Sequence, residues 1–93
     1  MPRNLAVEIS AHAVEQMRER GATESEVNAA IQNGEIEPVS KGRKMYRKNF
    51  QFNGTWRGKK YGIKQVAPFV AVETDKLVVV TIFVFAFREK RSS

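Results

Sequence analysis

His12, Arg20 and Thr81 are the residues of this chain whose types could carry out chemistry together. His12 is the only histidine, and a neutral imidazole can take up or release a proton near pH 7. The guanidinium of Arg20 could stabilise the charge that develops on a phosphate during its cleavage. Thr81 is the only hydroxyl in the apolar run 77–87 and could hold either side chain across a helix–sheet interface. These types fit a metal-independent ribonuclease, which needs a base for the ribose 2′-hydroxyl, cations for the phosphate and an acid for the leaving oxygen.

Each of these residues also has a structural interpretation. A histidine in the first turn of a helix often packs or hydrogen-bonds locally, and a β-branched threonine suits a strand, where its hydroxyl can donate to a backbone carbonyl. At about 100° per residue, His12, Gln16 and Arg20 share one flank of a helix. The spacing therefore allows His12, Gln16 and Arg20 to form one site on that flank, but it is equally compatible with structural roles for them.

A second candidate site is a strongly basic segment in the middle of the chain. Residues 41–64 hold nine cations and no acidic residue, whereas residues 1–40 carry a net charge of −4 and residues 65–93 a net charge of +1. Contact with phosphates is a common use of such a surface, and aromatic residues among the cations can stack on bases. We expect ten residues of this segment to bind nucleic acid: Lys41, Arg43, Lys44, Arg47, Lys48, Trp56, Arg57, Lys59, Lys60 and Lys64. The structural alternative is a solvated face, or an edge strand that lysines protect from aggregation.

The composition argues against several other classes of protein. The chain has 93 residues, of which 42% are hydrophobic and 28% charged, and this is typical of a single globular domain over residues 1–93. Without cysteine it has no disulfide, thiolate zinc site or cysteine nucleophile, and one histidine does not suffice for structural zinc, so we expect no metal and no cofactor. The N-terminus has no signal-peptide pattern, and the longest apolar run is too short to span a bilayer as a helix. We therefore expect a cytoplasmic protein that does not enter a membrane.

Two helices are predicted to position the first candidate site. Ser10 is a predicted N-cap and Gly21 a C-terminal stop, which places the first helix between them. Thr23 and Glu26 have the spacing of a capping box, in which each side chain accepts a hydrogen bond from a backbone N–H of the other residue. The second helix therefore follows Thr23 and ends at Gly34, where we expect a left-handed conformation.

After the second helix the hydrophobic period changes from helical to alternating. Asn53-Gly54 predicts a tight hairpin turn, with a return strand from about Thr55. A further strand is predicted from Ile63 to Glu73, in which Pro68 marks an edge or a break. The run from Leu77 to Phe87 is apolar on both faces, as expected of a central strand.

Together these elements predict an α+β fold in which two N-terminal helices pack on one face of a four-stranded antiparallel sheet. The helices span about residues 10–34, the sheet about residues 44–87, and residues 88–93 form a frayed polar tail. The basic residues of the first hairpin would then line the opposite face of the sheet or its rim.

The order of three motifs resembles a known family. Ser10 to Gly21 resembles the first-helix motif H-a-x-x-x-M-x-x-R-g, Glu24 to Gly34 the second helix s-E-x-E-V-x-x-A-I-x-x-G, and Val79 to Phe83 the last strand v-v-T-v-y. The family that they resemble is a domain-of-unknown-function family of small bacterial proteins. The resemblance implies a relation to the barnase–EndoU–colicin–RelE (RelE/ParE-like) superfold, in which N-terminal helices pack on a four-stranded antiparallel sheet.

What the resemblance implies for function is a metal-independent ribonuclease, often the toxin of a toxin–antitoxin system, with His12, Arg20 and Thr81 at the family's characteristic polar positions. Its partners would be RNA or the ribosome, and an acidic antitoxin or immunity protein. This chain departs from the pattern at Gln16, where many relatives have a basic residue, and at Phe83, where a tyrosine would supply a hydroxyl. The alternatives are a non-catalytic RNA- or ribosome-binding module and a basic interaction domain for an acidic protein.

Overall fold

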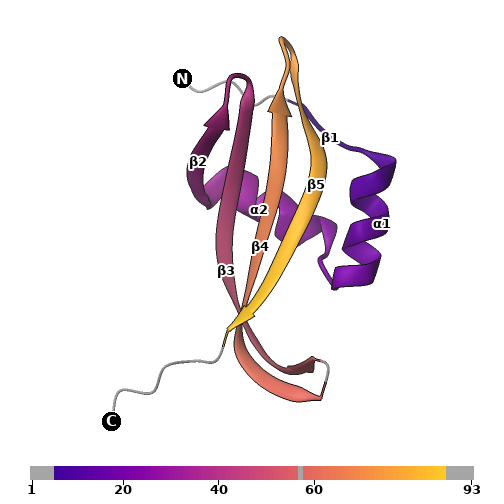
Figure 1. The fold of residues 1–93 in the computed structure, drawn as a ribbon, viewed down its shortest axis with the longest axis vertical. Coiled ribbons are helices and arrows are strands. Elements are labelled where there is room, and N and C mark those ends of the chain that lie inside the picture. The colour runs from indigo at the N-terminus through magenta and orange to yellow at the C-terminus, as the bar shows by residue number, and fades with distance from the viewer. Residues whose placement is uncertain (1–5, 57, 88–93) are drawn as a thin grey trace.

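The computed structural model describes residues 6–56 and 58–87. Its elements follow in the order β1 (Ala6–Ile9), α1 (Ala11–Arg20), α2 (Glu24–Asn33), β2 (Glu35–Ser40), β3 (Arg43–Trp56), β4 (Lys59–Val72) and β5 (Lys76–Phe87). Figure 1 shows the strands as one twisted sheet, with α2 crossing behind β3 and β4 and α1 lying beside β5. The predicted tail, residues 88–93, lies outside the described residues.

Both helices begin and end where the sequence predicts, so these predictions are confirmed. Ser10 caps α1 by accepting a hydrogen bond from the backbone N of Ala13 at 3.1 Å. Gly21 follows α1 with a φ of 77°, a left-handed conformation that costs glycine little. Thr23 and Glu26 form the complete capping box at the start of α2.

Gly34 does not adopt the left-handed conformation that the sequence predicts. Its φ of −79° and ψ of 171° are extended, so that prediction is wrong. A glycine is required there for space, because a Cβ would lie 2.4 Å from the carbonyl oxygen of Ala30 and 2.6 Å from that of Arg47. The end of α2 is therefore packed directly against the backbone of β3.

The sheet differs from the predicted one. It has five strands in the order β1-β5-β4-β3-β2, and it is mixed, because β1 runs parallel to β5 while the other pairs are antiparallel. The prediction of a four-stranded antiparallel sheet is therefore wrong. Hydrophobic periodicity does not reveal β1, which has four residues, or β2, whose six side chains are all exposed.

The long hairpin turns later than the sequence predicts. β3 continues through Asn53-Gly54 to Trp56, and β4 begins at Lys59, with Gly58 at a φ of 78° between them. The β3–β4 register shifts just before Gly54, so this dipeptide marks a bulge and the predicted turn is wrong. The two strands predicted after it are one strand, β4.

Pro68 lies in the middle of β4, a central strand, and its side chain is fully buried. Proline has no N–H to donate, and the β3–β4 pairing skips from Met45–Phe69 to Lys48–Val66 opposite it. The break in the ladder that the sequence predicts at Pro68 is thus confirmed.

One hydrophobic core fills the space between the helices and the sheet. Its buried residues come from both helices and the three long strands, and they include Ala13, Met17, Val27, Ala30, Tyr46, Val66, Val70, Val79 and Ile82. Within the described residues, no helix is both long enough and apolar enough to cross a membrane.

Candidate functional site

The outer edge of β5 is covered by two different elements in succession. β1 pairs with it from Lys76 to Val79, and the side chains of α1 take over beyond that point. The hydroxyl of Ser10 donates to the backbone oxygen of Val80 at 3.2 Å, and Nη1 of Arg20 donates to that of Ile82 at 2.6 Å. Polar side chains of the helix therefore satisfy backbone groups that an edge strand would leave without partners.

Gln16 joins Thr81 to the same helix. Its Oε1 accepts one hydrogen bond from the hydroxyl of Thr81 and another, at 2.9 Å, from the backbone N of Ile82. The hydroxyl in the middle of this apolar strand thus has a side-chain partner across the α1–β5 contact.

Arg20 is partly buried in the same contact. Besides its hydrogen bond to Ile82, its guanidinium lies 5.7 Å from the centre of the Phe83 ring, close enough for a cation–π interaction. The structure therefore brings Arg20 and Thr81 together, through Gln16 and Ile82.

His12 is not part of that cluster. Its side chain is exposed, and no hydrogen bond or ion pair joins it to any residue that the structure describes. Eight residues of helix place it about 12 Å along the axis from Arg20, whose side chain is directed to β5. The imidazole is accessible, but the structure does not bring it next to the other two predicted catalytic residues.

The predicted nucleic-acid-binding residues do not form one surface. Lys41 and Arg43 are exposed at the turn between β2 and β3, whereas Lys59 and Lys60 are exposed at the opposite end of the β3–β4 hairpin. A strand rises about 3.3 Å per residue, so the contour length of β3 from Arg43 to Trp56 is roughly 43 Å. The side chain of Trp56 and all of Arg57 lie outside the described residues.

The cations of β3 between these two ends have partly buried side chains. Arg47 pairs with Glu37 at 3.2 Å and donates to Gln65 at 3.3 Å. Lys44 and Lys48 are partly buried, and Nζ of Lys48 lies 5.8 Å from the centre of the Phe50 ring. The cations in the middle of β3 are therefore less available to a ligand than the exposed cations at the two ends of the hairpin.

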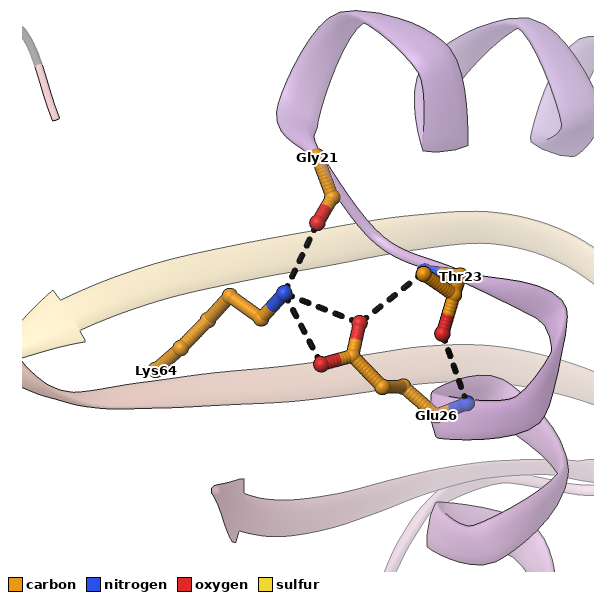
Figure 2. Close-up of polar contacts among 4 residues, drawn as sticks. All are labelled: Gly21, Thr23, Glu26 and Lys64. Atoms are coloured by element: carbon orange, nitrogen blue, oxygen red, sulfur yellow. Dashed lines mark hydrogen bonds and ion pairs between the residues drawn. The ribbon is translucent and has the colours of Figure 1, made fainter. Parts of the chain in front are cut away.

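Lys64 ties β4 to the corner between α1 and α2, as Figure 2 shows. Its Nζ donates to the carbonyl oxygen of Gly21 at 2.8 Å and lies 2.8 and 2.9 Å from the two carboxylate oxygens of Glu26. The side chains of Lys64 and Glu26 are only 13% and 20% exposed. Burial raises the pKa of Glu26, but the hydrogen bonds from Lys64 and from the backbone N–H of Thr23 outweigh it and hold the pKa below the ordinary 4.5.

A cavity of about 270 Å³ opens beside this corner, where α1 ends. One side is formed by the last turn of α1 and the other by strands, with the lining residues Arg18, Glu19, Arg20, Gly21, Phe52, Lys64, Val84 and Ala86. Arg18 was not among the residues expected to bind a ligand. Arg18 could have been suspected as a cation in the same helical turn as Arg20, but only the tertiary fold shows the cavity.

The comparisons with known proteins identify a family and no individual relative. The chain matches no curated protein and no solved structure. A family model matches residues 9–84, which extend from the end of β1 to within β5 and include both helices and the long hairpin. The chain belongs to the family described as Domain of unknown function (DUF4258).

Proposed function

We propose that this chain binds RNA through the outer end of the β3–β4 hairpin, called the arm here (residues 52–56 and 58–62). β4 pairs with β5 only as far as Ile63 and Phe87, so beyond this point the arm consists of two strands. Figure 1 shows it curving away past the end of β5. A two-stranded arm of this kind can reach a ligand that a flat sheet face cannot.

The charge of the arm carries the proposal. The arm includes two cations, Lys59 and Lys60, and no acidic residue. Lys59 and Lys60 are exposed and have no ion pair among the described residues. A phosphate that contacts them releases condensed counterions, which favours binding at low salt.

The other basic end of the hairpin is a weaker candidate. The backbone N of Val72 donates to the carbonyl oxygen of Gly42 at 2.8 Å, so the β2–β3 turn lies against the end of β4. Glu73 and Asp75 follow at once in the β4–β5 turn and are exposed. Their negative charge offsets that of the nearby cations, and nothing similar occurs in the arm.

The preference for RNA over other polyanions rests on the relation to the barnase–EndoU–colicin–RelE superfold, which remains part of the proposal. Two helices that precede the long strands support that relation, whereas the five-stranded mixed sheet differs from the four-stranded antiparallel sheet that the resemblance implied. A role on RNA also implies a cytoplasmic location.

The test is the affinity of the chain for a fluorescein-labelled single-stranded RNA, measured by anisotropy at 0.1 M salt. At a slope of about −0.7 per phosphate contact, removal of two contacts in Lys59→Ala/Lys60→Ala should weaken binding about 25-fold at this salt. Lys41→Ala/Arg43→Ala removes the same charge from the other end and should have a much smaller effect. Equal losses in the two variants, or no binding by the unmodified chain, would reject the arm as the RNA site.

RNA cleavage is a second candidate function, because the accessible His12 imidazole is free to act as general acid or base. RNA bound to the arm would have to extend along α1 to its first turn. Donors of Arg20 that do not bond to Ile82 could then contact a phosphate, while Thr81 would position Gln16 beside it.

This candidate predicts cleavage in the presence of EDTA with products that end in 2′,3′-cyclic phosphate. His12→Ala should lower the rate by about 10²- to 10⁴-fold if the imidazole transfers a proton. Glu15→Ala, at an exposed position on the same helix, is the matched control. A rate that His12→Ala leaves unchanged would remove the imidazole from the mechanism.

A further inference from the structure

The edge of β5 beyond Ile82 is open among the described residues. The N–H and C=O of Ile82 both point away from β4, because they bond to Gln16 and Arg20 of α1. In an antiparallel pair this direction alternates along the strand, and the β4–β5 register is unbroken from Thr81 to Phe87. The N–H and C=O of Val84 and of Ala86 therefore also point outward.

No described segment hydrogen-bonds to these outward groups. α1 ends at Arg20, whose contact with the strand is at Ile82, and β1 pairs only with the first residues of β5. Two consecutive outward residues thus offer two donors and two acceptors, in the spacing that another strand would match.

An aromatic row stands on the face of β5 opposite the helices, formed by Phe83, Phe85 and Phe87. The successive ring centres are 6.4 and 6.5 Å apart. Phe85 and Phe87 are 40% and 45% exposed, which is unusual for such large apolar side chains. Apolar side chains of a strand added at this edge would pack against this row.

The other face of the same edge carries the cavity at the end of α1. Val84 and Ala86 form part of its wall, and Arg18 and Arg20 lie on the side of the helix. Arg20 uses one of its five donors on Ile82, so the others are available to a ligand. A side chain that points from an added strand toward the helices would enter this cavity.

We propose that an extended acidic segment of a partner protein pairs with this edge as a sixth strand. Its backbone bonds to Val84 and Ala86. Its acidic side chains point toward Arg18 and Arg20, and the alternate, apolar side chains pack on the aromatic row. Backbone bonds supply affinity in this mode of binding, and alternate side chains supply specificity.

Charge selects an acidic segment over the other occupants of such an edge. Lys64 is already paired with Glu26, so at the cavity the two arginines face the single carboxylate of Glu19. The chain as a whole carries a net charge of +6, so a second copy would bring like charges together. Nucleic acid lacks the alternating donors and acceptors of a peptide backbone.

The test uses the full chain, ¹⁵N-labelled, titrated with a capped peptide of three Glu-Val repeats and, separately, with one of three Lys-Val repeats. The Glu-Val peptide should shift the amide resonances of Val84 and Ala86. With four-fifths of the chain bound, hydrogen exchange at these two amides should slow about fivefold, because only the free chain exchanges. The Lys-Val peptide should bind at least about tenfold more weakly.

Ala86→Pro removes one outward N–H without touching the β4 ladder and should weaken the Glu-Val peptide about tenfold. Ala86→Ser keeps that N–H and should bind as the unmodified chain does. Arg18→Glu changes only an exposed helix position and should reverse the preference between the peptides, so the proposal remains testable even if the proline variant fails to fold.

Three results would overturn the proposal. The first is the absence of shifts at Val84 and Ala86, or equal shifts with both peptides. The second is a dimer in sedimentation equilibrium whose Val84 and Ala86 amides are already protected, since a second copy would then occupy the edge. The third is protection of the same amides by single-stranded RNA. RNA binding by the arm does not depend on any of these outcomes.

Discussion

A single oxygen atom, Oε1 of Gln16, links α1 to two consecutive residues of β5. It accepts from the hydroxyl of Thr81 and from the backbone N–H of Ile82, while Arg20 bonds to the carbonyl of the same Ile82. Gln16, Arg20 and Thr81 therefore hold α1 and β5 together. Any role of Arg20 in binding phosphate has to be compatible with this contact.

Gln16→Ala should lower the free energy of unfolding by about 1–2 kcal/mol, because it leaves the Thr81 hydroxyl and the Ile82 N–H without a partner in a partly buried contact. Urea unfolding measures the change. Glu15→Ala alters an exposed neighbour and should stay within about 0.5 kcal/mol of the unmodified chain. If both variants have the same stability, the contact contributes nothing.

At this scale the sequence identifies unusual residues but not their partners. The single histidine and the lone hydroxyl of the last strand are visible by type alone. That Arg20 bonds to a carbonyl 62 residues away, or that Thr81 meets Gln16, depends on how α1 lies against β5. The sequence grouped His12 with Arg20 and Thr81, but in the structure only Arg20 and Thr81 lie at the contact with β5.

Elements that are fixed by contacts between residues close in sequence could be predicted, whereas those fixed by pairing with a distant strand could not. The capping residues act within three positions of one another, so Ser10, Thr23 and Glu26 predict both helices from sequence alone. Asn53-Gly54 has the composition of a turn, but pairing with β4 on both sides of it makes it a bulge. β1 joins the sheet through a strand some 70 residues later, which no local pattern indicates.

The Lys64–Glu26 contact makes the stability of the α1–α2 corner depend on pH. Because folding lowers the pKa of Glu26 below 4.5, its stabilisation is present above that value and is lost as the pH falls through the folded-state pKa. Glu26→Gln keeps a capping acceptor but does not titrate. It should be less stable than the unmodified chain at neutral pH, and the difference should disappear as the pH falls below the folded-state pKa of Glu26.

Urea unfolding of the two proteins at several pH values measures this difference. All other carboxylates are common to both, so the gap between the two curves reports Glu26 alone. A gap that stays constant as the pH falls would show that the Glu26 carboxylate gains nothing from Lys64.

Over the whole molecule, the basic segment of the sequence divides into parts with different roles. Arg47 and Lys64, partway along the two long strands, are paired with Glu37 and Glu26. Lys41 and Arg43 lie at one end of the long hairpin, and Lys59 and Lys60 lie at the other. A count of charges along the chain cannot show this, because the acidic partners come from β2 and α2. Lys41, Arg43, Lys59 and Lys60 remain exposed. Of these, only Lys59 and Lys60 in the arm have no acidic residue near them in sequence.

The salt dependence of RNA binding tests this account most directly. The slope of log K against log salt reports how many phosphates the chain contacts, at about 0.7 per contact for a single strand. Lys59→Ala/Lys60→Ala should make the slope shallower by about 1.4, while Lys41→Ala/Arg43→Ala should leave it nearly unchanged. An unchanged slope in the first variant, or a loss of the same size in the second, would contradict RNA binding by the arm.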